Sequence, residues 1–253
     1  MNAVAPGVRR VEHIMGMPVV VDVRDEDFDE KVLEQMFDWL RIADATFSTY
    51  KEDSEISRLN RGELTLAEAH PDVREVLDRC EALRTETDGY FDLRVAAADA
   101  IDPSGLVKGW AVDRAASILD ESGICNYAVN VAGDMRLRGR AVPEPCWSVG
   151  IQHPLDPNAV AAVVEANDLA IATSGAYARG DHVIDPHTRR PPVGVLSVTI
   201  TGPELATADA YATAAFAMGE VGIHWTARLH GYEAMTILAD ERVLSTPGFP
   251  SAR

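Results

Sequence analysis

The spacing of apolar residues changes near Tyr127, and this change constrains the fold more than any other feature. Before it, apolar side chains recur at helical spacing, which predicts helices from the acidic cluster 25–27 to Phe47, over 71–87 and from about Gly109 to Gly123. After it, the apolar runs are short and alternating, as in half-buried strands. We therefore expect an α+β protein in which helices dominate the first half and strands the second.

Short β-like runs supply the expected sheet. Strands are predicted at 17–23, 127–131, 147–151, 160–164, 169–173, 195–200 and 234–238, with an alanine-rich helix at about 207–218. No internal repeat, low-complexity tract or linker rich in glycine and serine interrupts the chain. We therefore expect one domain over 1–253.

The charge of the chain limits its ligands. Its 23 basic and 40 acidic side chains give a formal charge of −17, and no stretch gathers a basic stripe. Nucleic-acid binding is disfavoured, because phosphate neutralisation is the main source of its affinity. An acidic protein that handles a phosphorylated ligand has to offset its own field locally with a metal ion, a single Lys or Arg, or backbone amides.

The cysteines and the N-terminal segment indicate the compartment. Cys80, Cys125 and Cys146 show no CxxC spacing, so we expect three buried thiols rather than disulfides or a zinc site. Residues 1–15 contain no apolar region of signal-peptide length, and no run approaches the ~20 apolar residues of a membrane span. We expect a cytoplasmic protein, although a leader removed beforehand would not be visible.

Two polar clusters occur in the helical half. The segment 47–60, FSTYKEDSEISRLN, mixes hydroxyls, carboxylates and an amide, although a solvated loop with Ser54 or Asp53 capping a short helix would also explain it. Lys108 lies between glycines at a predicted helix start, where an ammonium and free amides can hold phosphate. A surface charge is the alternative, and the P-loop spacing is absent.

Two further clusters follow strands. Gly133 and Asp134 come directly after the strand 127–131, where a glycine permits a tight turn or close approach of a ligand. His182 follows the TSGAY run at 173–177, and Asp185 lies three residues further on. A carboxylate can orient an imidazole for proton transfer, although a histidine in a turn can equally be structural.

Asp209 and Thr213 lie one turn apart on the alanine-rich helix, so that their oxygens can point to one spot. Two hard oxygen donors suit magnesium, which takes few protein ligands and keeps water or phosphate oxygens for the rest. The alternative is that Asp209 favours the helix dipole and that Thr213 bonds to its own turn.

Taken together and in this order, the motifs resemble the ApbE family of FAD:protein FMN transferases. The resemblance runs from Met15 to about Gly219 and rests on FSTYKEDSEISRLN, GYFD at 89–92, KGWAVD at 108–113, NVAGD at 130–134, TSGAY, HVIDP at 182–186 and DAYAT at 209–213. It implies the ApbE-like flavin transferase fold, with mixed or antiparallel sheets flanked by helices and an FAD cleft between lobes.

The resemblance also assigns residues. It places around FAD the residues Met15, Ser48, Tyr50, Glu55, Asn60, Phe91, Asp92, Lys108, Gly133, Asp134 and Asp185. It implies that Asp209, Thr213 and the backbone carbonyl of Gly105 hold Mg²⁺, and that His182 is the catalytic residue. Three positions depart from the family pattern: Met17, Ala132 where glycine is usual, and Arg189 where glycine follows the HVIDP turn.

The activity that this resemblance implies is cleavage of the FAD pyrophosphate and transfer of FMN to a Ser or Thr hydroxyl of an acceptor protein, with release of AMP. Magnesium would neutralise charge on the pyrophosphate, and His182 would take the hydroxyl proton. Two other interpretations stay open, namely a magnesium-dependent FAD pyrophosphatase, in which water is the acceptor, and a non-catalytic flavin-binding protein.

Overall fold

The computed structural model describes residues 7–94, 100–175 and 183–252. Its strands are β1 (Val8–Ile14), β2 (Met17–Val23), β3 (Tyr127–Val131), β4 (Asp134–Arg138), β5 (Trp147–His153), β6 (Asp156–Ala166), β7 (Leu169–Gly175), β8 (Val195–Gly202), β9 (Glu233–Leu238) and β10 (Val243–Ser245). Its helices are α1 (Lys31–Phe47), α2 (Glu55–Asn60), α3 (Pro71–Glu86), α4 (Ser104–Glu121), α6 (Leu205–Ala217) and α7 (Gly222–Thr226), and a 3₁₀ turn spans Gly219–Val221.

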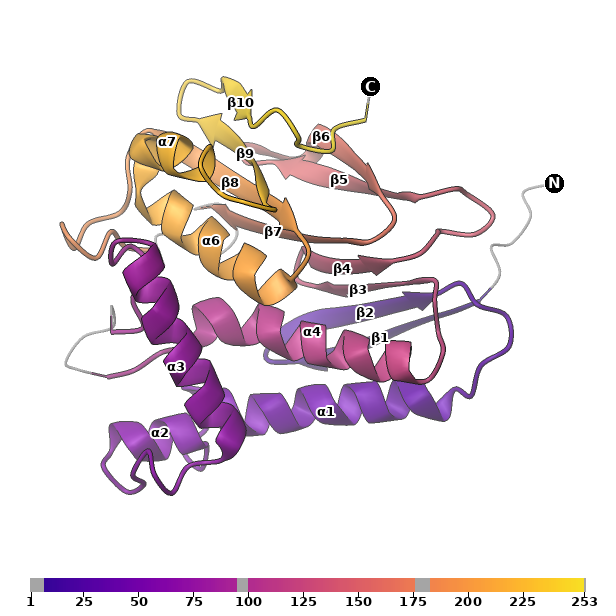
Figure 1. The fold of residues 1–253 in the computed structure, drawn as a ribbon, viewed down its shortest axis with the longest axis horizontal. Helices are drawn as coiled ribbons and strands as arrows, with labels where there is room; N and C mark the ends of the chain where they lie inside the picture. The colour runs from indigo at the N-terminus through magenta and orange to yellow at the C-terminus, as the bar shows by residue number, and fades with distance from the viewer. Residues whose placement is uncertain (1–6, 95–99, 176–182, 253) are drawn as a thin grey trace.

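The described part of the chain forms a sheet with helices on one face and a β-hairpin on the other (Figure 1). Strand order in the main sheet is β1-β2-β3-β4-β7-β8-β9-β10, and every neighbouring pair is antiparallel. Helices α1, α4 and α6 pack against the sheet and each other, whereas β5 and β6 form a separate two-stranded sheet. The predicted α+β class with antiparallel sheets is confirmed.

Alternation along the strands produces the two cores. In β3, Tyr127, Val129 and Val131 face the helices and are at most 1% exposed, whereas Ala128 faces the hairpin. The hairpin contributes Trp147 to this second, smaller core. Burying apolar side chains on both faces stabilises the central strands, at about 25 cal/mol for each Å² removed from water.

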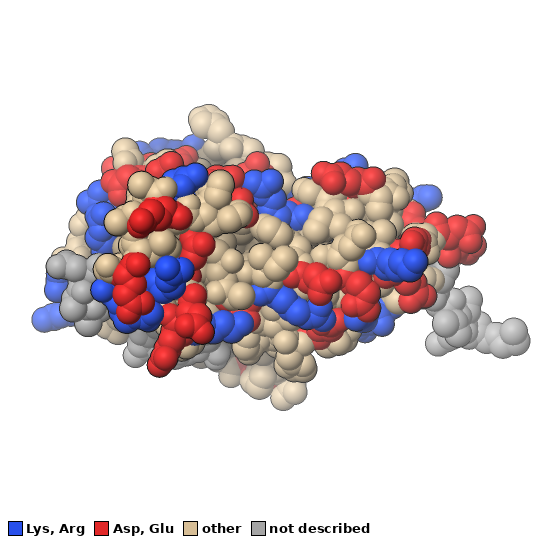
Figure 2. All heavy atoms as spheres, turned by 90° about the horizontal axis from the view of Figure 1, so that it is seen from below, with Lys and Arg blue, Asp and Glu red and all other residues tan. Residues whose placement is uncertain are grey.

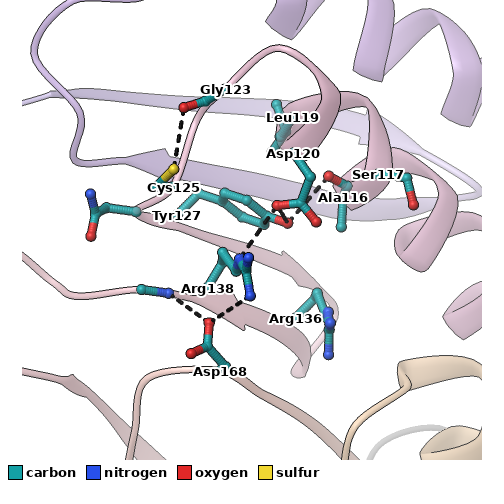
Figure 3. Close-up of polar contacts among 12 residues, drawn as sticks. Ala116, Ser117, Leu119, Asp120, Gly123, Cys125, Tyr127, Arg136, Arg138 and Asp168 are labelled. Atoms are coloured by element: carbon teal, nitrogen blue, oxygen red, sulfur yellow. Dashed lines mark hydrogen bonds and ion pairs between the residues drawn. The ribbon is translucent and has the colours of Figure 1, made fainter.

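A polar cluster fixes the C-terminal end of α4 against the sheet (Figure 3). The Tyr127 hydroxyl donates to the Ala116 carbonyl at 3.2 Å and lies 3.0 Å from Asp120 Oδ1. Arg138 on β4 lies 3.6 Å from Asp120 and 3.2 Å from Asp168, in the turn before β7. Burial raises the pKa of Tyr127 above its ordinary value, which already keeps the hydroxyl protonated at neutral pH.

Two predicted helix starts are wrong, and both errors have a local cause. Helix α1 begins at Lys31 rather than in the acidic cluster 25–27, because Asp25 instead accepts the backbone N–H groups of Cys125 and Asn126. Helix α4 begins at Ser104 rather than near Gly109, which lies in its second turn. The sequence reading also missed β1, β4, α7 and β10, and it made β6 too short.

Surface properties agree only partly with the sequence. Cys80 is buried, but Cys125 is exposed and Cys146 is half-buried, so the prediction of three buried thiols is wrong for two of them. On the face shown in Figure 2, acidic and basic side chains of the described residues are interspersed, without a continuous basic patch. Within the described ranges, no helix is both long and apolar enough for a membrane crossing.

Candidate active site

Two hairpin turns lie side by side at one end of the sheet. Met15 and Gly16 connect β1 to β2 with φ of 57° and 70°, and Ala132 and Gly133 connect β3 to β4 with φ of 52° and 100°. Positive φ at both positions is typical of type I′ hairpins. The Ala132 N–H donates to the Pro18 carbonyl at 3.3 Å. The predicted site residues Met15 and Gly133 therefore lie at the same end of the sheet.

Strands β4 and β7 add polar groups to the same end. Asp134 Oδ1 accepts a hydrogen bond from the Thr173 N–H at 3.0 Å. The Thr173 hydroxyl lies 2.9 Å from that of Thr199 on β8, and Ser174 Oγ lies 3.4 Å from Thr213 Oγ1 on α6. The NVAGD motif and the first residues of TSGAY therefore meet next to α6.

Lys108 joins two buried carboxylates. Its Nζ forms an ion pair with Asp134 and lies 3.4 Å from Asp209 Oδ1. Asp134 is 2% and Asp209 is 4% exposed. Burial raises the pKa of Asp209 to about 7, against the opposing effect of Lys108, and the nearby Asp134 adds to the rise. With one ammonium for two carboxylates, ionisation of both leaves a net negative charge here.

Gly105 brings the backbone of α4 close to an aromatic ring and to α6. A Cβ built on Gly105 would lie 3.1 Å from Phe91 Cε2 and 3.8 Å from Thr213 Cγ2. The Phe91 N–H donates to Thr87 Oγ1 at 2.9 Å, which fixes the backbone of Phe91 just after α3. Three residues that the sequence assigns separately to FAD and to magnesium are thus packed together.

The residues around Asp209 fit a hard divalent cation. Asp209 Oδ2 is buried and has no hydrogen-bond partner among the described residues. Thr213 lies one turn further along α6, and a Cβ on Gly105 would lie 3.8 Å from Thr213 Cγ2, so the α4 backbone passes close to that side chain. In the part of the chain that the structure describes, no group of three His, Cys, Asp or Glu could hold a metal. A cation here would therefore combine one carboxylate with neutral oxygens, a donor set that suits Mg²⁺.

The segment around α2 uses its predicted site residues for backbone contacts. Ser48 Oγ accepts the Tyr50 N–H at 3.2 Å, and the Tyr50 side chain is 96% exposed. Glu55 accepts the backbone N–H of His70 at 2.7 Å. The Asn60 amide makes hydrogen bonds of 2.8 and 3.0 Å to the backbone of residue 101, before α4. These hydrogen bonds organise the backbone around α2 and before α4.

Asp92 and Asp185 also organise turns. Asp92 accepts the Arg94 N–H at 2.8 Å and lies 3.6 Å from Arg84 Nε. Asp185 accepts the N–H of His187 and the Thr188 hydroxyl, each at 2.8 Å. Both aspartates therefore stabilise local backbone, which is an Asx-turn role.

The HVIDP turn contacts the GYFD segment, which the sequence did not predict. His187 Nε2 lies 3.0 Å from the Asp88 carbonyl, and its ring packs edge-on to Tyr90 with centroids 4.5 Å apart. Arg189, singled out from the sequence as a departure, adopts φ of 57° within this turn, so the backbone has a conformation that is more usual for glycine. His182 lies outside the described residues, as do Ala176 and Tyr177 of TSGAY.

Comparisons with known proteins match most of the chain. A family model described as the ApbE family matches residues 15–101 and 97–236. The FAD:protein FMN transferase of Vibrio cholerae serotype O1 is 32% identical over 209 residues, covering 71% of this chain and 62% of the relative. The enzyme of the same name from Haemophilus influenzae is 28% identical and covers 76% of this chain and 73% of the relative. The chain thus spans less than two thirds of the Vibrio cholerae relative.

Solved structures share the fold. The structure titled flavin transferase ApbE from Vibrio cholerae superposes with a TM-score of 0.85 at 26% identity, covering 97% of this chain and 99% of that one. The ApbE protein of Thermotoga maritima superposes with a TM-score of 0.85 at 22% identity, covering 95% and 97%. At that identity the second match shows the fold alone.

Proposed function

Because the chain belongs to the ApbE family, we propose that it is a magnesium-dependent FAD:protein FMN transferase. It cleaves the FAD pyrophosphate, transfers FMN to a Ser or Thr hydroxyl of an acceptor protein and releases AMP. The names of the relatives from Vibrio cholerae and Haemophilus influenzae support the reaction. The magnesium requirement and the hydroxyl acceptor are part of the proposal.

The observation that carries the proposal is the buried cluster at the sheet end. Lys108 belongs to α4, Asp134 to β4, and Asp209 and Thr213 to α6. One carboxylate oxygen of Asp209 has no hydrogen-bond partner in the described ranges. Lone buried carboxylate oxygens are costly unless a cation or a donor satisfies them. A site that binds only flavin rings would not require this arrangement.

The residues have distinct tasks in the transfer. A bound Mg²⁺ would neutralise pyrophosphate charge and would be held by Asp209, Thr213 and the Gly105 carbonyl. Asp134 fixes the ammonium of Lys108, which contributes positive charge beside the phosphates. As the acceptor oxygen bonds to the FMN phosphorus and the bond to the AMP oxygen breaks, His182 takes the hydroxyl proton.

The test supplies FAD, MgCl₂ and the acceptor protein of the Vibrio cholerae relative to this chain. Mass spectrometry of the acceptor should show the addition of one FMN, and chromatography should show equivalent AMP. FMN and AMP without a modified acceptor would identify a pyrophosphatase, and intact FAD would identify a flavin-binding protein. At limiting Mg²⁺, Asp209→Asn should strongly reduce the modification, whereas Asp240→Asn, on the exposed surface, should not.

A further inference from the structure

Helix α6, which carries Asp209 and Thr213, receives its N-terminal cap from another helix. Its own N-cap residue, Glu204, makes no side-chain cap hydrogen bond. Helix starts leave backbone N–H groups that need partners. Asp113 of α4 provides them, because its carboxylate oxygens accept the N–H groups of Leu205 at 3.1 Å and of Ala206 at 2.8 Å.

The backbone of α4 touches the same turn of α6. A Cβ added at Gly109 would lie 2.5 Å from the Leu205 carbonyl oxygen and 2.7 Å from Ala206 Cα. These are backbone atoms, which cannot swing aside as a side chain can. Gly109 is therefore needed for the close approach of the two helices, and it lies one turn before Asp113 on the same face of α4.

Lys108 makes the next contact along α6. Its Nζ lies 3.4 Å from Asp209 Oδ1, one turn beyond the capped N–H groups. Lys108, Gly109 and Asp113 all belong to the KGWAVD motif. One short segment of α4 therefore holds the first two turns of α6, through a cap, a backbone contact and an ion pair.

The composition of α6 explains why such a device is needed. Alanine fills most of its positions, and 11 of its 13 residues are buried. Small side chains make shallow ridges, so packing alone fixes the rotation and the axial position of such a helix weakly. The directions in which the Asp209 and Thr213 oxygens point depend on both the rotation and the axial position of α6.

We propose that Asp113 is a positioning residue for the metal site: by capping α6, it sets the rotation at which Asp209 and Thr213 share one cation. This inference rests on the proposed function for the existence of the metal site. A carboxylate is well suited to the task, because the partial positive charge of a helix N-terminus favours an anion. Arg136, which also donates to the Pro203 carbonyl before α6, lies 3.9 Å from Asp113 and adds a favourable charge.

Asp25 offers a matched control for mutagenesis. Its carboxylate also accepts two backbone N–H groups, those of Cys125 at 3.2 Å and Asn126 at 2.7 Å. These residues precede β3, whereas the candidate site adjoins the turn that follows it. Asp25→Ala and Asp113→Ala thus both remove hydrogen bonds to two backbone N–H groups, but only those of Asp113 belong to the helix that carries Asp209 and Thr213.

The experiment measures Mg²⁺ binding by calorimetric titration of the metal-free protein, well below the melting temperature of each variant. We expect Asp113→Ala to weaken Mg²⁺ binding about tenfold or more and Asp113→Asn to weaken it less, because the amide oxygen still accepts one N–H. Gly109→Ala should also weaken it. Asp25→Ala should lower the melting temperature but leave Mg²⁺ binding unchanged.

The outcomes separate this inference from the proposed function. If the unaltered protein binds Mg²⁺ and the Asp113 variants bind it equally well, the cap is only structural and the inference is overturned. If Asp113→Ala does not fold, Asp113→Asn and Gly109→Ala decide by the same criterion. If the unaltered protein binds no Mg²⁺, the metal site itself is wrong, and this inference fails with it.

Discussion

The buried Asp209 should make the metal-free protein less stable as the pH rises from about 5 to 7. Burial raises its pKa from 3.8 to about 7, because the charged form loses its hydration. In the unfolded chain the same carboxyl has its ordinary pKa. Between the two values, the folded protein holds a proton that the unfolded chain has released. The unfolded state binds fewer protons there, so stability decreases as the pH increases.

The size of the effect follows from this difference. With a folded pKa of about 7, the folded state carries about one extra proton at pH 5 and about half of one at pH 7, and each full extra proton costs about 1.4 kcal/mol of unfolding free energy for each pH unit. The loss due to Asp209 is therefore about 2 kcal/mol over this interval. It is a large share of the ~5–15 kcal/mol by which native domains are stable.

The assay is urea unfolding of the unaltered protein and of Asp209→Asn, in the presence of a chelator, at several pH values between about 5 and 8. Asparagine does not titrate, so the stability of the variant relative to the unaltered protein should rise by about 2 kcal/mol between pH 5 and pH 7. Asp240→Asn is the control, because a hydrogen bond from Arg242 lowers the pKa of Asp240 and its titration ends below this range. Parallel pH profiles for Asp209→Asn and the unaltered protein would refute the reasoning.

Three further predictions concern the proposed catalytic histidine, the proposed metal ligands and the β3–β4 turn. His182→Ala should lower turnover by roughly 10²- to 10⁴-fold with FAD affinity nearly intact, and loss of FAD binding in step with activity would indicate a structural histidine. Asp209→Asn should raise the Mg²⁺ concentration needed for activity more than Thr213→Val does, because a charged ligand outweighs a neutral one. The effects of the two changes should be non-additive in the double variant, because the second change has little left to remove once Mg²⁺ no longer binds. Ala132→Gly should keep or raise the melting temperature, since φ is 52° there, whereas Gly133→Ala, at φ of 100°, should lower it.

The strands that the sequence predicts best are those in which apolar side chains recur with the period of a strand. The bounds of β2 and β3 agree with the prediction because both strands are short β-branched runs, in which fully buried apolar side chains recur at every second residue, as at Val19, Val21 and Val23. Strand β4 escaped detection because Arg136 and Arg138 face the helix layer, where they lie near Asp113 and Asp120. Arginine side chains at positions that face the helices interrupt the alternation of apolar and polar residues on which strand prediction depends.

Gly109 shows a second limit of sequence reading. A glycine inside a helix usually costs about 1 kcal/mol relative to alanine, so its position suggests a helix start. In the structure, the close approach of α6 accounts for it, at 2.5 Å from a Cβ to the Leu205 carbonyl. A contact between segments so far apart in the chain leaves no local pattern. For the same reason the motif predicted Lys108 near phosphate but not its two carboxylate partners.

The charge of the cluster connects these observations to the binding of FAD. With both carboxylates ionised, Asp134 and Asp209 outweigh Lys108 by one negative charge, in surroundings where both are at most 4% exposed. A pyrophosphate adds further negative charge, so these residues alone would repel the substrate that we propose. A bound divalent cation would change the net charge of the cluster from negative to positive. The negative charge of a pyrophosphate would in turn balance the charge of the cation. Because coupling between two ligands is reciprocal, FAD and Mg²⁺ should each strengthen the binding of the other by the same factor.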